Sequence, residues 1–107
     1  MRYRVLLTAS ADRDLADIHA WIAEHDSLER ADHWLDHVLE VIAALETSPD
    51  RGATPAELRE IGTRDFRQGY FKPYRLVYRV RGRDVIVMLI TDGRRDLSML
   101  LARRLLD

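Results

Sequence analysis

Two amphipathic stretches dominate the first half of the chain. Hydrophobic residues recur every three or four positions between residues 11 and 45, with polar residues between them, which predicts two helices that each bury one face. Thr8 or Ser10 offers an N-cap for the first helix, Ser27 offers one for the second, and Pro49 ends the second. The positions predicted to face the core are Ala11, Leu15, Ile18, Ile22, Ala31, Trp34, Leu35, Val38, Val41, Ile42 and Leu45, with Trp21 beside them.

The remaining hydrophobic positions alternate with polar ones, which is typical of strands. Lys72-Pro73 and Gly82 supply turns in the second half of the chain, and a loop runs from Pro49 to Pro55. A short terminal helix is predicted beyond Arg94, where leucines recur at helical spacing. The strands are predicted at residues 2–8, 65–71, 74–81 and 85–91, the last of them central, with a short candidate edge strand at 57–61.

These elements predict an α+β fold in the order β-α-α-β-β-β-α, formed by one domain of residues 1–107. Short turns join the later strands, so we expect these strands to run antiparallel. The expected architecture is an N-terminal strand and a helical hairpin packed on a twisted antiparallel sheet, with a short C-terminal helix.

Composition narrows the possible classes of protein. The chain has no cysteine, which excludes disulfides and cysteine-based catalytic or metal sites. No apolar run approaches the roughly 20 residues of a membrane span, and the first residues do not form a signal peptide, so we expect a cytoplasmic protein. The net charge of −1 conceals a division: residues 1–50 carry four arginines and eleven acids, giving −7, whereas residues 51–107 carry thirteen Lys/Arg and seven acids, giving +6.

The excess positive charge is concentrated on the predicted sheet. Alternation in the strand at residues 74–81 places Arg75 and Arg79 opposite its apolar side chains, on a face that we expect to be open, with Arg67 within reach on the neighbouring strand. Fixed cations on a rigid sheet suit an anion, either phosphate or the carboxylates of a partner protein. The alternatives are a solvated face, or arginines that pair with nearby aspartates to fix the sheet ends. The candidate binding residues are Arg67, Lys72, Arg75, Arg79, Arg94 and Arg95.

The sequence gives little support for a metal site or for catalysis. His33 and His37 have a spacing that two metal ligands can use, with Glu40 or Asp36 as a third, but all lie on the polar face of the second helix, so no metal or cofactor is expected. A ribonuclease could hold phosphate with the arginines, but it also needs a general acid and base. The histidines all lie in the acidic helical half, so this reaction lacks evident partners.

A series of short segments runs along nearly the whole chain: residues 3–8, 11–18, 21–23, 49–52, 71–80 and 92–96, followed by Leu100-Leu101. Together these segments resemble the RelE/ParE superfamily, the toxins of type II toxin–antitoxin systems. Each segment is short, and their order and spacing across nearly the full chain carry the resemblance. The superfamily fold is a helical hairpin on a twisted antiparallel sheet, which agrees with the predicted order.

The resemblance implies two possible activities. RelE-like members are ribosome-dependent messenger RNA endoribonucleases, and their basic catalytic roles would fall on Arg67, Arg75 and Arg95. The tyrosine that such nucleases carry six residues after the last of these is replaced by Leu101. ParE-like members inhibit DNA gyrase and often read His-Gly-Arg-Arg-Asp where this chain has Asp92 at the first position.

We therefore expect a ParE-like toxin of a plasmid-stabilisation system that inhibits gyrase by binding. The resemblance also implies a cognate antitoxin, acidic and folding as it binds, that forms a hetero-oligomer with the toxin and wraps its helical hairpin and sheet. We expect the acids of that antitoxin to meet the arginines of the positively charged half.

Overall fold

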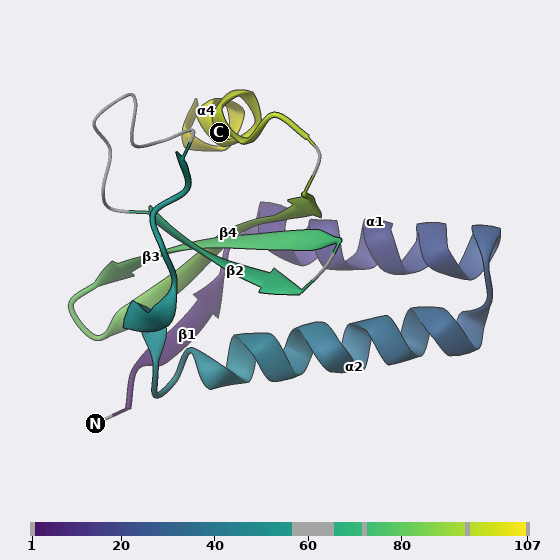
Figure 1. The fold of residues 1–107 in the computed structure, drawn as a ribbon, viewed down its shortest axis with the longest axis horizontal. Coiled ribbons are helices and arrows are strands. Elements are labelled where there is room, and N and C mark those ends of the chain that lie inside the picture. The colour runs from purple at the N-terminus through teal and green to yellow at the C-terminus, as the bar shows by residue number, and fades with distance from the viewer. Residues whose placement is uncertain (1, 57–65, 72, 94, 107) are drawn as a thin grey trace.

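The fold contains the predicted elements in the predicted order (Figure 1). A computed structural model describes residues 2–56, 66–71, 73–93 and 95–106, so the candidate edge strand at 57–61 lies outside the described residues. The elements are β1 (Arg4–Leu7), α1 (Ala9–His25), α2 (Leu28–Ala44), the 3-10 turn η1 (Pro49–Arg51), β2 (Phe66–Phe71), β3 (Tyr74–Arg81), β4 (Asp84–Asp92) and α4 (Leu97–Leu106).

Side-chain caps fix where the helices begin. Thr8 Oγ1 accepts a hydrogen bond from the Ala11 N–H at 3.0 Å, so Thr8 rather than Ser10 is the N-cap of α1. Ser27 Oγ accepts from the Arg30 N–H at 3.1 Å, which confirms the predicted cap of α2. Ser27 lies at the reversal between the helices, where α1 ends at His25 and α2 begins at Leu28.

The four strands form one sheet in the order β1-β4-β3-β2. The strands joined by short turns, β2, β3 and β4, are antiparallel as predicted, and β4 is central. β1 pairs with β4 in parallel, so the sheet as a whole is mixed rather than purely antiparallel. The helical hairpin between β1 and the later strands removes the constraint that a short turn imposes, and β1 is free to enter the sheet in either direction.

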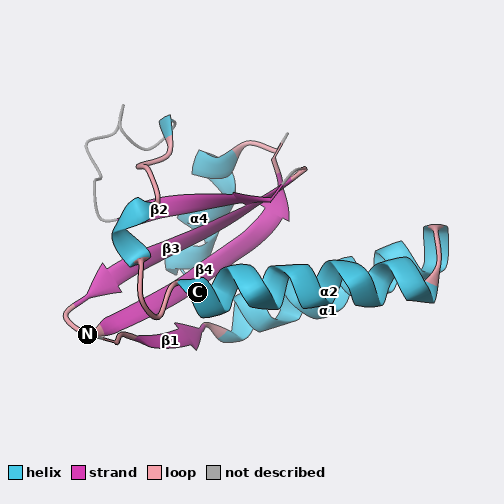
Figure 2. Ribbon diagram, turned by 60° about the horizontal axis from the view of Figure 1, so that its bottom comes forward, coloured by secondary structure: helices cyan, strands magenta, loops and turns pink. Residues whose placement is uncertain are grey.

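Both faces of the sheet are covered (Figure 2). α1 and α2 pack on one face around Leu76, Tyr78 and Val87, on the side that alternation predicts. The opposite face was expected to be open, but Leu97 and Leu101 of α4 are buried there. The periodicity predicted α4 itself, and its leucine face needs an apolar surface that only this side of the sheet leaves available.

An irregularity in the β3–β4 pairing supplies part of this second apolar face. Val77 pairs with Leu89, whereas the next residue, Tyr78, pairs with Val87, so Met88 is an extra residue in β4. Met88 and Leu89 consequently both pack in the cluster beneath α4. A β-bulge thus interrupts strict alternation and widens the apolar surface on which the terminal helix rests.

The helical hairpin extends beyond the end of the sheet (Figures 1 and 2). Trp21, in the part of α1 near this tip, is 58% exposed and stacks on His25, with ring centroids 4.4 Å apart. An exposed tryptophan of this size is an unusual feature of a small domain's surface. None of the described helices is long and apolar enough to cross a membrane.

Candidate functional site

The predicted arginines do not form one patch. Residues directly opposite each other in the β2–β3 pair share a face, and Arg67 is opposite Tyr78, on the side of the helical hairpin. Its Nη1 donates to the carbonyl oxygens of Asp50 and Gly52 at 3.2 and 2.8 Å. Arg67 therefore fastens the loop after α2 and lies on the opposite face from Arg75, which corrects the expectation that the two are neighbours.

Arg75 is buried rather than exposed, with 5% of its surface accessible. Its Nε and Nη2 both donate to Oε1 of Gln68, at 2.9 and 2.6 Å, and its guanidinium carbon lies 5.8 Å from the centre of the Tyr70 ring. The predicted open face is wrong at this position. The arginine stem lies close to Gly93, where a Cβ would come within 3.4 Å of the Arg75 Cγ.

The other candidates differ in their surroundings. The Arg79 guanidinium lies 5.0 Å from the centre of the Phe66 ring and is half-buried. Arg95 is exposed. Lys72 and Arg94 lie outside the described residues. Among the candidates that the structure describes, Arg95 is the most accessible to a partner.

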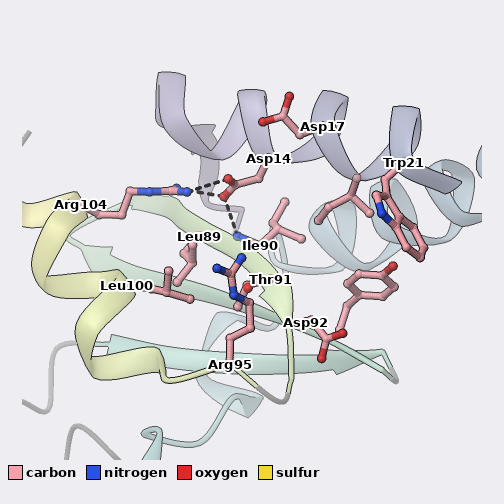
Figure 3. A pocket seen from close by; sticks show the side chains of 12 residues that line it. Asp14, Asp17, Trp21, Leu89, Ile90, Thr91, Asp92, Arg95, Leu100 and Arg104 are labelled. Atoms are coloured by element: carbon pink, nitrogen blue, oxygen red, sulfur yellow. Dashed lines mark hydrogen bonds and ion pairs between the residues drawn. The ribbon is translucent and has the colours of Figure 1, made fainter. Parts of the chain in front are cut away.

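Arg95 projects into a groove of about 430 Å³ between α1, the end of β4 and α4 (Figure 3). Trp21 lies at one side of this groove, and the ion pair between Asp14 and Arg104 lies at the other side. Tyr74 is also among the lining residues. The lining therefore combines an accessible arginine with exposed aromatic surface, which is the composition of many protein-binding hot spots. The full lining is Asp14, Asp17, Ile18, Trp21, Tyr74, Leu89, Ile90, Thr91, Asp92, Arg95, Leu100 and Arg104.

Sequence reasoning missed the Asp14–Arg104 pair. In the sequence, Asp14 is one of several acids in the first helix, and Arg104 is one of two adjacent arginines in the terminal helix. In the structure their side chains form two hydrogen bonds of 2.6 and 2.9 Å. Ninety residues separate the partners, so only the tertiary fold brings them together.

The site has little equipment for acid–base catalysis. Burial raises the pKa of Tyr78, and burial together with the negative charge of Asp92 raises the pKa of Tyr74, so both phenols favour the protonated form. Leu101, at the position of the RelE-like tyrosine, is buried in the core beneath α4. Within the described ranges, no three His, Asp or Glu side chains gather as a metal site would require.

Comparison with known families decides the assignment. Residues 5–97 match the family described as "ParE toxin of type II toxin-antitoxin system, parDE". The chain belongs to the ParE toxin family. It is also 30% identical over 101 residues to Toxin ParE3 of Caulobacter vibrioides, an alignment that covers 94% of this chain and 97% of the relative.

Solved structures agree with this ParE fold. The structure described as the chromosomal ParDE TA system from P. aeruginosa superposes with a TM-score of 0.70 at 18% identity, covering 85% of this chain and 96% of that one. A mutant of the E. coli toxin RelE in the free state superposes with a TM-score of 0.65 at 14% identity, covering 98% and 96%. At these identities the likeness concerns the fold alone, and it is family membership that implies an antitoxin partner.

Proposed function

We propose that this ParE-family toxin inhibits DNA gyrase by binding it, without catalysis of its own, and that a cognate antitoxin neutralises it. Family membership supports the toxin role, and the state of the candidate catalytic arginines supports inhibition by binding. The alternative is a RelE-like ribonuclease that cuts messenger RNA on the ribosome.

The environment of Arg75 favours inhibition by binding over cleavage of messenger RNA. A catalytic arginine must reach the scissile phosphate, but Arg75 is buried and directed at Gln68. Arg67 donates to two backbone carbonyls on the other face of the sheet. Of the three arginines that a nuclease would use, Arg95 alone is exposed. A single accessible cation without a paired acid and base supports recognition better than phosphodiester cleavage.

We assign the target-binding surface to the groove around Arg95 and Trp21. The exposed tryptophan supplies apolar area, and the guanidinium supplies a directional contact for a carboxylate or a carbonyl of the target. Arg81 and Arg83 at the β3–β4 turn are also exposed, but they lie at the opposite end of β4 from this groove.

The deciding experiment measures two activities of the purified toxin. Supercoiling by purified gyrase should fall as toxin is added, whereas messenger RNA in a reconstituted translation reaction should remain intact. Arg95→Ala should weaken the inhibition, and Arg83→Ala is the matched control because it removes an exposed arginine far from the groove. Cleavage of the messenger RNA with unaffected gyrase would overturn the proposal and establish the nuclease.

The antitoxin proposal has a separate test. The gene next to that of the toxin should encode a short protein with an acidic C-terminal segment. Co-expression of this protein should restore growth, and the protein should co-purify with the toxin. We expect its acids to contact Arg95 and the other accessible cations of the positively charged half. A neighbour that neither binds the toxin nor restores growth would contradict this part of the proposal while leaving the gyrase result untouched.

A further inference from the structure

The central strand β4 extends further than β1, its neighbour on one side. β1 pairs with residues 84–87 of β4 and ends at Leu7, and the Thr8 N–H then donates to the Val87 carbonyl at 3.1 Å. β4 continues to Asp92, so its last residues have no strand beside them on that edge in the described part of the chain. An edge of this kind presents backbone donors and acceptors that need other partners.

Two charged side chains occupy this edge (Figure 3). Asp14 Oδ2 accepts a hydrogen bond from the Ile90 N–H at 3.0 Å, and Arg104 Nη1 donates to the Met88 carbonyl at 3.0 Å. The same two side chains bind each other at 2.6 and 2.9 Å. Only 15% of the Asp14 side chain and 19% of the Arg104 side chain are exposed, so the pair is largely withdrawn from water.

Among the described side chains of α4, Arg104 is the last that makes an inward contact. Leu97 and Leu101 are fully buried against the sheet, and Arg104 follows three residues later on the same stripe of the helix. Met99 and Leu105 are more than half exposed. A helix of ten residues is too short to be stable alone, so its attachment to the sheet depends on these few inward contacts.

We propose that the Asp14–Arg104 pair is a latch for α4. In the closed state the pair ties α4 to α1 and covers the edge of β4. In the open state α4 leaves the sheet as a unit, and the backbone of residues 88–90 and the apolar face around Val77 and Leu89 become accessible. Removal of either partner leaves the other charge buried without compensation, which shifts the balance toward the open state.

The unmodified protein provides the first test, by native-state hydrogen exchange in low concentrations of denaturant. The amides of α4, and the Ile90 amide that Asp14 covers, should exchange through a shared opening with a weak denaturant dependence. Amides at the centre of β3, such as Leu76, should exchange more slowly and through global unfolding. If α4 and the centre of β3 exchange with one rate and one denaturant dependence, α4 is not a separate cover and the proposal is wrong.

Matched variants then test the latch itself. Asp14→Asn and Arg104→Met should each accelerate exchange in α4 relative to β3, by about 100-fold for a buried pair that loses one partner. Asp17→Asn, one turn along α1, and Arg103→Met, beside Arg104, remove exposed charges and should leave the ratio unchanged.

The ratio of the two exchange rates separates a latch from a general contribution to stability. If exchange accelerates equally in α4 and β3, the pair stabilises the whole domain. If exchange does not accelerate in either, the pair does not hold α4 on the sheet. Either result overturns the latch. If a variant fails to fold, the exchange pattern of the unmodified protein still decides whether α4 opens alone.

Discussion

The guanidinium of Arg75 donates two hydrogen bonds to one oxygen, Oε1 of Gln68, on the neighbouring strand. The two residues are not opposite each other, since Arg75 pairs with Tyr70 and Gln68 with Val77. The contact therefore runs diagonally across the sheet and covers the Tyr70 ring with a cation. A side chain held in this way belongs to the scaffold.

Arg75→Ala should destabilise the fold. It leaves the half-buried Gln68 oxygen without these two donors, which costs about 1–3 kcal/mol, and it also removes the packing of the arginine stem. For a domain of this size we expect the melting temperature to fall by about 4–8 °C for each kcal/mol. A circular-dichroism melt measures this, with Arg83→Ala as the exposed control. An unchanged melting temperature would show that Arg75 does not stabilise the fold, and Arg75 would again be a candidate for binding a partner.

Gly52 should not accept a side chain. A Cβ built there would lie 2.8 Å from the Gln68 carbonyl oxygen and would collide with the Tyr78 hydroxyl, which donates to the Pro49 carbonyl. Gly52→Ala should therefore displace the loop that Arg67 fastens and lower the free energy of unfolding by about 1–3 kcal/mol.

Gly69→Ala is the matched control for this substitution, because a Cβ there would meet only Val41 Cγ1, at 3.9 Å. Chemical denaturation should separate the two variants clearly. Equal stability of the two would show that the loop adapts to a methyl group and that the close approach at Gly52 is unimportant.

Stability should fall above about pH 10, where tyrosines in the unfolded chain lose their protons. Burial raises the pKa of Tyr78 and, together with the charge of Asp92, that of Tyr74, so the folded chain keeps these protons to higher pH. The unfolded state then binds fewer protons than the folded state, and unfolding becomes more favourable as pH rises. Melts at several pH values from 8 to 11 should show this decline, and Tyr78→Phe should flatten it. A decline of the same slope in Tyr78→Phe would assign it to other groups.

The sequence predicts the elements well because their signals are local. Helix caps such as Thr8 and Ser27, and the apolar spacing of α1 and α2, act within a few residues, and the structure confirms both. The same is true of the alternation that places Leu76 and Tyr78 toward the helices. The direction of β1 could not be predicted from the sequence, because no short turn joins β1 to β4, the strand beside it.

The candidate site depends on long-range pairing, and there the sequence predictions were weaker. Alternation gives the face of each residue within a strand, but the face of Arg67 relative to Arg75 depends on the register between β2 and β3. Which face α4 covers is likewise a tertiary property, and so is the burial of Arg75, whose stem lies close to Gly93. The exposure of Arg95 agrees with its predicted role as a binding residue, which stays a prediction.

Arg95→Ala should reduce toxicity without weakening the fold. The Arg95 side chain is exposed and points into the groove beside Trp21, and its backbone N–H, which donates to the Asp92 carbonyl at 3.2 Å, is retained in the variant. Exposed substitutions of this kind usually change stability by less than about 0.5 kcal/mol. Interface arginines are often hot spots, so we expect inhibition of the target to weaken by roughly tenfold or more.

Growth after induced expression, compared with a melt of the purified variant, separates a role in recognition from a role in the fold. Arg103→Ala on the exposed side of α4 is the control. Full toxicity of Arg95→Ala at the same expression level would move the binding surface away from this groove.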